Sequence, residues 1–508
     1  MVTASIIIAV TVTGVGVIMA FLRWLRVAQR EHYLPGSTSR FAIRWWKARP
    51  VSVLLALGAL LGAALSIRIP LGASVTGLAL LFGPVGLTLR GRSAPLVWTR
   101  RLRSVAVVAG SLVVVLTILS SVATGSVAPL AVTAIALPVL IDLSLFVLRP
   151  LERVIAQRYV RRARQRLNTV KPVVVAITGS YGKTTTKEYV RHLVSGALTV
   201  VASPASFNNM AGLCRTVNEH LSTGTEVLVA EVGTYGRGEI REICRWLRPS
   251  IGVITALGPV HLERMGSLHN IAHAKSEILE TVEQAILNTD YPHLRAIADE
   301  VSTHKAVFRC GSSTENCHVA TIRSEQSIEL YITGNRVATV DKQGIFAGNL
   351  ASAVAVTLAL GVPVEHTVKR LGSLPTPAHR QQVATASNGV RVIDDTYNAN
   401  PAGAAHALTL MSQICNSGRR VVVSPGMVEL GDRQNHENEE FARNAAKIAT
   451  DILIVGRTNL SSMRKGAQDG KARVQTFGSR DEAVRWVREN LAEGDVVLYE
   501  NDLPDHFP

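Results

Sequence analysis

The glycine-rich segment Gly179–Thr186 contains one lysine and three threonines, and it has the chemistry of a phosphate-binding loop. It follows Pro172–Ile177, an apolar run that predicts a buried strand, and a helix can begin at Gly182. A strand, a tight turn and a helix N-terminus direct free backbone N–H groups and the positive end of the helix dipole at an anion. We expect Lys183 to reach the β- and γ-phosphates of a nucleotide and Thr184 to offer its hydroxyl to Mg²⁺. The residues expected to contact the nucleotide here are Gly179, Ser180, Tyr181, Gly182, Lys183, Thr184 and Thr185.

The spacing of this loop separates it from the commonest phosphate loop. That loop has its first glycine where this chain has Ile177, and the first glycine here is Gly179. The shorter Gly-x-x-Gly-Lys-Thr-Thr form resembles the loop of the Mur ligases, which build the peptide stem of bacterial peptidoglycan. The resemblance implies ATP and Mg²⁺ as cofactors.

Further segments resemble the Mur ligases, in the family's order, from about residue 171 to residue 432. Ser206–Leu213 resembles the Asn-rich segment after the loop, which implies that Asn208 and Asn209 contact substrate. Val227–Gly233 is an apolar strand that ends in an acid, and it resembles the site of the Mg²⁺-binding glutamate, here Glu231. An acid at a strand end suits Mg²⁺, which prefers hard oxygen ligands.

Two more segments resemble the remaining metal-binding parts of the family. Ile254–Glu263 resembles the segment that carries a metal-binding histidine, here His261, and Ile271–Glu277 resembles the helix whose lysine, here Lys275, is carbamylated in many members. A plain ammonium would repel a metal ion, whereas a carbamate made with CO₂ is an anionic oxygen ligand. The alternatives are an ordinary loop histidine and a solvated helix lysine. The expected metal ligands are Thr184, Glu231, His261 and Lys275.

The nucleotide site is expected to continue into a third region. Phe346–Ala353 resembles the adenine-contacting segment, with Gly348 where the family usually has histidine and with Asn349 retained. A helix-capping asparagine is the alternative. Arg380 resembles the family's arginine over the γ-phosphate. The expected catalytic residues are Lys183, Lys275 and Arg380.

The run from Asp394 to Pro401 is close to the signature of the MurF-type branch, which joins a D-Ala-D-Ala dipeptide to the peptidoglycan precursor. The resemblance implies that Asp395 contacts the ribose hydroxyls. It also implies that Tyr397, Asn398 and Asn400 face the nucleotide or the incoming amine. The ending departs from this branch, because the acidic turn Tyr499–Pro504 stands where a Lys-Gly-Ser turn is usual.

The N-terminal third has the composition of a membrane region. Five apolar stretches, most of them near the ~20 residues needed to cross a bilayer as a helix, precede residue 150. They are Ala4–Leu22, Val51–Ile67, Leu71–Leu89, Val105–Ala123 and Pro129–Leu148. Basic residues gather in alternate connections, so the positive-inside rule predicts five crossings, an outside N-terminus and a cytoplasmic C-terminal part. Asp142, inside the last stretch, has a functional role, an interfacial role or a helix-pairing role in this interpretation.

Charge and cysteine content exclude other classes of protein. The net charge of +16 is concentrated in residues 1–171, which hold only three acids, Glu31, Asp142 and Glu152. Because these basic residues lie between apolar runs, membrane topology explains them and no nucleic-acid partner is expected. The five cysteines form no Cys-x-x-Cys pair, which argues against a zinc site and against a disulfide framework.

The sequence predicts an all-α transmembrane region at residues 1–150 and a basic linker at 151–171. An α/β phosphate-loop domain, the Mur ligase central domain, is expected at 172–363 and a Rossmann-like α/β domain at 364–508. We expect a multi-pass plasma-membrane ligase that forms an amide through an acyl phosphate. The membrane bilayer, a lipid-linked carboxylate, and an amino acid or dipeptide amine are the expected partners. The alternatives are a membrane-bound polyamide synthase of the poly-γ-glutamate kind and a non-catalytic nucleotide-binding scaffold.

Overall fold

The chain folds into two compact units. The computed structural model describes residues 2–90, 95–204, 207–324, 327–340, 345–375, 381–397, 399–414, 418–503 and 507. The first unit comprises Met1–Val154 with Gly456–Thr458 and Leu503–Pro508, and the second comprises Ile155–Val455 with Asn459–Asp502.

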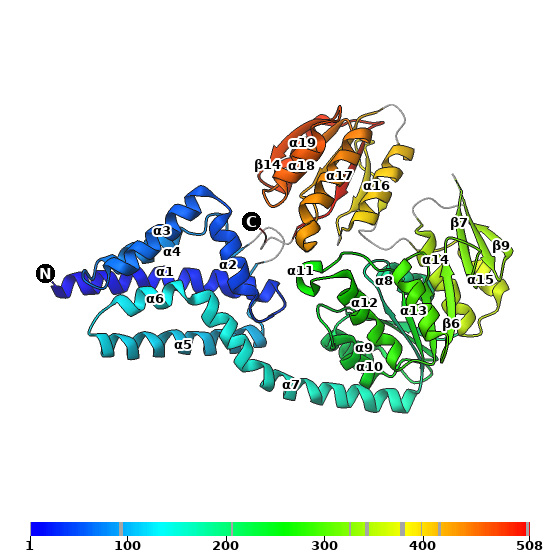
Figure 1. The fold of residues 1–508 in the computed structure, drawn as a ribbon, viewed down its shortest axis with the longest axis horizontal. Coiled ribbons are helices and arrows are strands. Elements are labelled where there is room, and N and C mark those ends of the chain that lie inside the picture. The colour runs from blue at the N-terminus through cyan, green and yellow to red at the C-terminus, as the bar shows by residue number, and fades with distance from the viewer. Residues whose placement is uncertain are drawn as a thin grey trace. The chain divides into compact units, whose positions relative to one another are not determined.

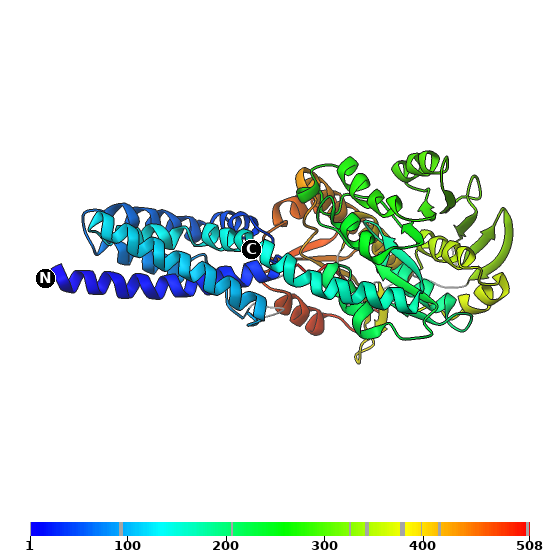
Figure 2. The same cartoon turned by 90° about the horizontal axis from the view of Figure 1, so that it is seen from below.

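The first unit is helical throughout its described elements (Figures 1 and 2). Its helices are α1 (Val2–Arg30), α2 (Ser37–Lys47), α3 (Pro50–Leu65), α4 (Gly72–Phe82), α5 (Arg100–Thr124), α6 (Ala128–Ile135) and α7 (Leu137–Val170), the last of which continues into the second unit. Small residues let α1 and α4 approach closely, since a Cβ on Gly16 or Gly77 would overlap the backbone of the other helix. Thr13 Oγ1 donates to the Ala73 carbonyl at 2.8 Å across the same contact.

Within the described residues, two helices are long and apolar enough to cross a membrane, Thr3–Arg30 and Arg100–Thr124. The pairs α2 with α3, bent by 113°, and α6 with α7, bent by 66°, bring the number to four if each pair counts as one span. The expected stretch Leu71–Leu89 is wrong as a single long helix, because α4 is only 11 residues long. Pro84 has no N–H and disfavours helix in the residue before it, so the helix ends ahead of Gly83.

Asp142 forms the N-terminal cap of α2. Its carboxylate accepts from the backbone N–H of Thr38 at 3.2 Å and of Ser39 at 2.8 Å, and from Ser39 Oγ at 2.6 Å. The first N–H groups of a helix have no partner inside the helix, and Gly36, the residue before α2, offers no side chain to cap them. The helix-pairing role is therefore the one that the contacts support.

The second unit begins with a nine-stranded sheet in the order β2-β3-β1-β4-β5-β6-β7-β8-β9. The strands from β2 to β7 are parallel to their neighbours, and β8 and β9 complete an antiparallel edge. They are β1 (Val173–Thr178), β2 (Val200–Ala202), β3 (Val227–Glu231), β4 (Ile251–Ile254), β5 (Gln284–Asn288), β6 (Ala306–Gly311), β7 (Val319–Arg323), β8 (Ile328–Ile332) and β9 (Asn335–Val340).

Helices cover both faces of this sheet because its strands are apolar on both sides. One core contains α8 (Lys183–Val194), α14 (Ala347–Ala359) and α15 (Val364–Leu371). The other contains α9 (Met210–His220), α10 (Glu239–Leu247) and α13 (Pro292–Val301). Ala163 and Leu167 of α7 belong to this second core, so the segment expected to be a linker is helical and partly packed. The short helices α11 (Leu262–Met265) and α12 (Leu268–Ser276) follow β4.

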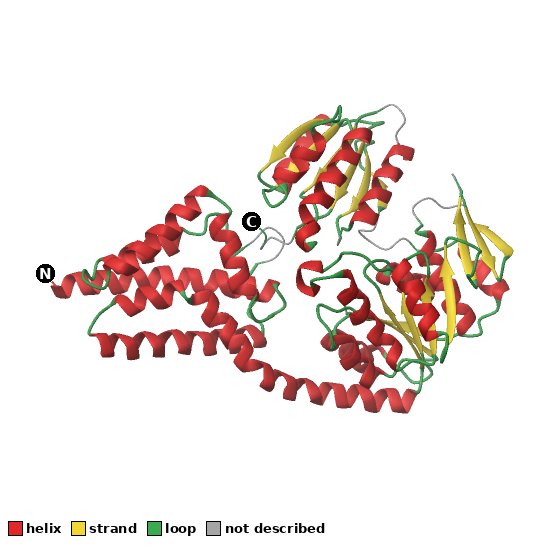
Figure 3. Cartoon of the chain, viewed as in Figure 1, coloured by secondary structure: helices red, strands yellow, loops and turns green. Residues whose placement is uncertain are grey.

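A second sheet of six strands has the order β10-β11-β15-β12-β13-β14, with only β10 antiparallel to its neighbour (Figure 3). Its strands are β10 (Gln382–Thr385), β11 (Arg391–Asp395), β12 (Arg420–Ser424), β13 (Asp451–Val455), β14 (Arg473–Phe477) and β15 (Val496–Glu500). Its helices are α16 (Pro401–Ile414), α17 (Gln434–Ile448), α18 (Leu460–Ala467) and α19 (Arg480–Asn490). The two sheets with their helices match the expected pair of α/β domains.

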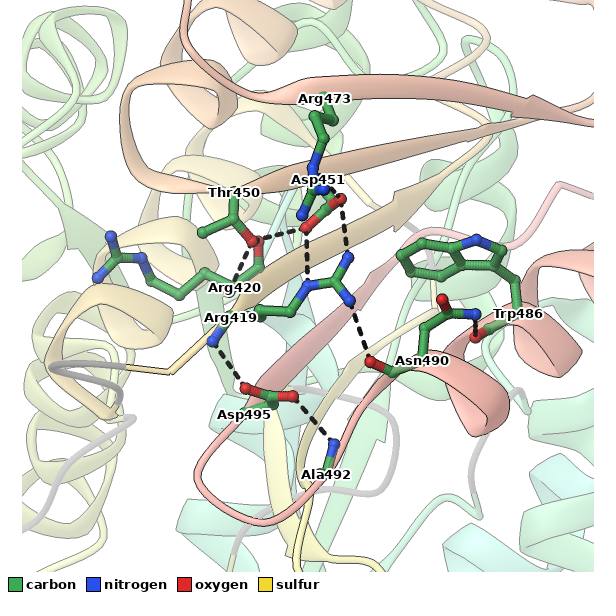
Figure 4. Close-up of polar contacts among 9 residues, drawn as sticks. All are labelled: Arg419, Arg420, Thr450, Asp451, Arg473, Trp486, Asn490, Ala492 and Asp495. Carbon is green, nitrogen blue, oxygen red and sulfur yellow. Dashed lines mark hydrogen bonds and ion pairs between the residues drawn. The ribbon is translucent and has the colours of Figure 1, made fainter.

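A buried carboxylate fixes the amino ends of three of these strands (Figure 4). Asp451, 0% exposed, accepts from Arg419 NH2 at 3.0 Å and from Thr450 Oγ1 at 2.7 Å, and it pairs with Arg473 at 3.2 Å. Arg419 also lies over the Trp486 ring. Ligands of parallel sheets bind at the carboxyl ends of the strands, so this opposite edge has a structural role.

Candidate active site

The phosphate loop connects β1 to α8, as the sequence predicts. Gly182 precedes α8 with φ of 80°, a left-handed conformation that favours glycine. A Cβ at Gly182 would overlap the side-chain amide of Asn349. The expected adenine contact, Asn349, therefore lies against the loop and is 9% exposed.

Hydrogen bonds fasten the loop to the segment after β4. Ser180 Oγ donates to the Gly258 carbonyl and accepts from the Gly258 N–H, both at 3.0 Å. Thr255 Oγ1 donates to the carbonyl of Tyr181. Burial, followed by the charge of Tyr291, raises the pKa of the Tyr181 phenol, so this hydroxyl stays neutral. The Ser180 side chain and the Tyr181 carbonyl thus hold the loop in place, which leaves the other backbone groups of the loop to contact phosphate.

Glu231 receives contacts from three side chains at the end of β3, two from α8 and one from the segment before α9. Thr184 Oγ1 donates to Glu231 Oε2 at 2.9 Å, and Asn208 Nδ2 donates to Oε1 at 3.3 Å. Lys187, which is 0% exposed, lies 3.7 Å from Oε2 and donates to the Ser203 carbonyl at 2.8 Å. Lys187 is not among the residues predicted from the sequence, although its position one helical turn after Lys183 is a signal.

Lys183 folds back over the loop, with its Nζ donating to the Gly179 carbonyl at 2.7 Å. Thr185, two residues later in the first turn of α8, is buried with 8% exposure. Lys183 also lies close enough to Lys275 and His261 that its charge lowers the pKa of both. The structure therefore gathers these predicted residues at the carboxyl ends of β1, β3 and β4.

Lys275 is 4% exposed on α12. Burial, assisted by the positive charge of Lys183, holds the pKa of Lys275 well below its usual value. Among the described residues, its ammonium group has no hydrogen-bond or ion-pair partner. A neutral buried amine is the form that adds to CO₂, so the environment suits carbamylation and does not suit a solvated lysine.

His261 contacts the second sheet's domain through its Nδ1, which hydrogen-bonds to the carboxylate of Glu429. Arg264 NH2 donates to the other oxygen of Glu429 at 2.8 Å, and the Tyr235 ring packs on both His261 and Arg264. Burial alone would raise the pKa of Glu429, but His261 and Arg264 more than offset it and lower the pKa to about 2. Burial also lowers the pKa of His261, against the opposing effect of Glu429.

These residues fit an Mg²⁺ site only if nucleotide and carbamate complete it. Within the described ranges, no three His, Cys, Asp or Glu side chains are gathered as a metal-binding group. Glu231 and the Thr184 hydroxyl supply oxygen atoms that already lie together. The buried amine of Lys275 would add an anionic ligand on carbamylation.

Gly348 accounts for the departure from the usual histidine. A Cβ there would lie 2.6 Å from Asn288 Nδ2, so the Asn288 amide occupies space that a side chain at 348 would need. Asn288 is 3% exposed and ends β5. The adenine-facing segment therefore differs in shape from the usual family pattern.

Asp395 lies at the end of β11 and is 6% exposed. Gln381 Nε2 donates to its Oδ2 at 3.3 Å, and Gln381 Oε1 hydrogen-bonds to His406 Nδ1. Burial and the charge of Arg323 lower the pKa of His406 to about 4, and its ring lies 4.3 Å from that of Phe346. Gln381, His406 and Phe346 connect Asp395 to the segment that begins α14, and of these three only Phe346 belongs to a segment predicted to contact the nucleotide.

The remaining predicted contacts differ in what their side chains do. Asn209 Oδ1 accepts from the Gly212 N–H and Asn400 Oδ1 from the Gly403 N–H, each at 2.9 Å, so both cap helices. Their remaining amide groups are what substrate could contact. Tyr397 is 51% exposed. Arg380 and Asn398 lie outside the described residues.

A cavity of about 850 Å³ lies on the same domain, and Asp290, one of its lining residues, also lies beside Gly348. Asp290, Arg295, Asp299, Arg309 and His318 are among its polar lining residues. Arg309 pairs with Asp299 at 2.6 Å, and Arg295 NH2 donates to the Thr289 carbonyl at 3.1 Å. These groups satisfy one another and indicate no ligand.

Comparisons with known proteins agree with this geometry. The Mur ligase middle domain family matches residues 177–356, and the Mur ligase, glutamate ligase domain family matches residues 379–499. The UDP-N-acetylmuramoyl-tripeptide–D-alanyl-D-alanine ligase of Mycobacterium leprae is 30% identical over 362 residues, covering 64% of this chain and 70% of the relative. The enzyme of the same name from Bacillus subtilis is 27% identical over 335 residues, covering 64% and 72%.

The solved structures that resemble this chain include MurF ligases. The MurF ligase of Thermotoga maritima in complex with ADP superimposes with a TM-score of 0.59 at 26% identity, covering 68% of this chain and 80% of the other. MurF from Acinetobacter baumannii gives 0.59 and 26%, covering 68% and 77%.

Proposed function

The chain belongs to the Mur ligase family, a family of ATP-dependent, ADP-forming ligases, and from this premise we propose that it is a membrane-anchored ligase that forms an amide in a cell-envelope precursor. The observation that carries the proposal is the gathering of Lys183, Thr184, Glu231 and Lys275 at one sheet edge. A buried lysine beside a phosphate loop and an acid would be costly in a scaffold, since an unpaired buried charge destabilises a fold.

The proposed reaction has two steps. The substrate carboxylate attacks the γ-phosphorus of ATP, which gives an acyl phosphate and releases ADP. The amine then attacks the acyl carbon, phosphate leaves, and the amine loses a proton to give the amide. The barrier falls mainly through positioning and charge neutralisation.

The side chains divide this work. Lys183 leaves the Gly179 carbonyl to contact the β- and γ-phosphates, and the loop N–H groups hold the remaining oxygens. Thr184, Glu231, His261 and carbamylated Lys275 would hold Mg²⁺, which neutralises charge on the transferring phosphoryl group when bound. Asp395, positioned by Gln381, would contact the ribose, and Arg380 the γ-phosphate.

The substrate side of the proposal follows from the first unit. The family models begin at residue 177, so the helical unit lies outside them. Relatives are named for a UDP-sugar tripeptide and D-alanyl-D-alanine. We propose that here the carboxyl substrate is carried on a membrane lipid, while the amine is an amino acid or a dipeptide. Confinement of enzyme and substrate to one membrane raises their effective concentration without any new contact.

ADP formation by the full-length protein tests the ligase proposal. Purified protein receives ATP, Mg²⁺, a membrane extract and candidate amines, and ADP and the mass of new lipid-linked products are measured. We expect ADP and amide to appear together and Lys183→Ala to abolish both. A non-catalytic scaffold would release no ADP with any amine, and chain-length analysis of the product separates a single addition from a polyamide.

A further inference from the structure

Three arginines form a stripe along the end of α1. Arg23, Arg26 and Arg30 are spaced by three and four residues, so they lie on one face of the helix. The apolar segment Thr3–Arg30 has 28 residues, more than the ~20 needed to cross the hydrocarbon core. If the helix spans the bilayer, its last turns therefore extend into a headgroup layer. We call Arg23, Arg26 and Arg30 the arginine stripe.

The stripe faces the loop that follows α4. Arg23 NH1 and NH2 donate to the carbonyls of Gly83 at 3.0 Å and Leu81 at 2.9 Å. Arg26, 0% exposed, donates to the Thr88 carbonyl at 3.3 Å. These three acceptors are backbone carbonyls, which satisfy N–H groups but carry no net charge.

Carboxylates are scarce in the first 141 residues, which contain the stripe. Glu31 is the one acid in residues 1–141 of the sequence. It is 3% exposed and lies 3.6 Å from Arg40 of α2. The next acid, Asp142, already accepts three hydrogen bonds at the start of α2. One carboxylate cannot neutralise the stripe and Arg40 together.

Buried guanidinium nitrogens point to the missing partner. Arg30 Nε and NH2 and Arg23 Nε are buried, and none of them has a hydrogen-bond partner within the described part of the chain. A buried charged donor without an acceptor destabilises a fold. The local chemistry is therefore that of a site for an anion with several acceptor oxygens.

We propose that the arginine stripe binds the phosphate group of a membrane lipid. Guanidinium forms bidentate, charge-assisted hydrogen bonds with phosphate oxygens, and the end of a membrane span lies where lipid phosphates are concentrated. That this lipid also carries the carboxyl substrate rests on the proposed function, whereas phosphate recognition does not.

Lipid binding to the full-length protein tests this inference without ATP or amine, so failure of the ligase proposal cannot affect the result. The detergent-solubilised protein is mixed with phosphatidic acid, farnesyl diphosphate, phosphatidylcholine or inorganic diphosphate, and adducts are counted by native mass spectrometry. We expect phosphatidic acid and farnesyl diphosphate to bind and phosphatidylcholine, whose phosphate is screened by choline, to bind at least fivefold more weakly. Preference for farnesyl diphosphate over phosphatidic acid would identify a polyprenyl carrier as the source.

Variants localise the binding. Arg30→Gln should weaken phosphatidic acid binding about fivefold, the effect of ~1 kcal/mol per arginine near a phosphate layer. Arg30→Lys, which keeps the charge but not the bidentate geometry, should restore only part of it, and Arg68→Gln in the exposed connection between α3 and α4 should change nothing. Equal binding by Arg30→Gln and wild type overturns the proposal. The proposal is also overturned if the wild type binds inorganic diphosphate but none of the lipids. That outcome does not depend on whether any variant folds.

Discussion

At the scale of single residues, Lys275 combines a buried position with a nearby positive charge. Burial and the charge of Lys183 both disfavour the ammonium form, so the pKa of Lys275 is lowered. The amine therefore stays neutral at a lower pH than the amine of an ordinary lysine does. We predict that Lys275→Ala loses ADP-forming activity because the metal loses an anionic ligand. Short-chain carboxylic acids should restore part of that activity by occupying the place of the carbamate.

The control for this variant is His273→Ala, an exposed position on the same helix. It should keep the activity of the wild type. Full activity of Lys275→Ala without added acid would show that this lysine has no part in metal binding.

Lys187 has a positioning role in this account. It is wholly buried, and its contacts with Glu231 and the Ser203 carbonyl fix the orientation of the proposed metal ligand. Partners behind a metal ligand typically contribute ~10–100-fold to affinity or activity. We therefore predict that Lys187→Met lowers kcat/KM by about that factor and raises the Mg²⁺ concentration for half-maximal rate, while Lys369→Met, at an exposed position on α15, does neither. An unchanged Mg²⁺ requirement would leave Lys187 with a packing role only.

The sequence could predict Thr184 and Glu231 because a short motif defines each. It could not predict Glu429 or His406, whose partners lie far away along the chain. His261 and Glu429 are 168 residues apart, and nothing in either segment specifies the other. Likewise, Asn209 and Asn400 are predicted from the sequence to contact substrate, whereas in the structure both also cap helices. The sequence cannot separate the two roles, because the same amide group serves either purpose.

At the scale of elements, the contact between α11 and the segment after β12 joins the two α/β domains. Glu429 accepts hydrogen bonds from His261 and Arg264, and its carbonyl accepts from the Glu263 N–H at 3.2 Å. We predict that Glu429→Gln lowers the free energy of unfolding at pH 7 by ~1–3 kcal/mol, because it removes a charged acceptor from a partly buried pair.

The same contact has a defined pH dependence. The pKa of Glu429 is lowered to about 2 in the folded chain, so its contribution is complete above the ordinary value near 4.5 and is lost as pH falls through about 2. Denaturant unfolding of the wild type should show this loss between about pH 5 and pH 2, and Glu429→Gln should lack it. Glu440→Gln, at an exposed site on α17, serves as the control. The same acid-induced loss in Glu429→Gln would contradict the assignment.

Apolarity predicted where helices would form in the N-terminal unit but not how they would end or bend. The stretch Pro129–Leu148 divides into α6 and α7 with a bend of 66°. Pro138 lacks the N–H that a continuous helix would bond to the Ala134 carbonyl. Composition sets how much of a helix can enter lipid, whereas prolines and glycines decide whether it stays straight.

At the scale of the whole molecule, the loop charges predict the side of the membrane on which each connection lies. With the C-terminal part in the cytoplasm, five crossings place the N-terminus outside the cell and four crossings place it inside. Labelling of the connections between helices distinguishes these two arrangements. We predict that an impermeant maleimide added to intact cells modifies Thr124→Cys, at the exposed end of α5. Pro35→Cys, in the exposed turn before α2, should react only after the cells are permeabilised. The reverse pattern would put the nucleotide site on the side that lacks ATP.

The most direct test of the account compares the whole chain in bilayer discs with the fragment 155–508 on two carboxyl substrates, one lipid-linked and one UDP-linked. The fragment begins at Ile155 so that Ala163 and Leu167 keep their places in the core. We predict that the whole chain prefers the lipid-linked substrate in kcat/KM by at least about tenfold, because both are confined to one membrane, and that the fragment loses this preference. If the fragment ligates the UDP-linked substrate as fast as the whole chain does, and both ignore the lipid-linked one, the account is wrong.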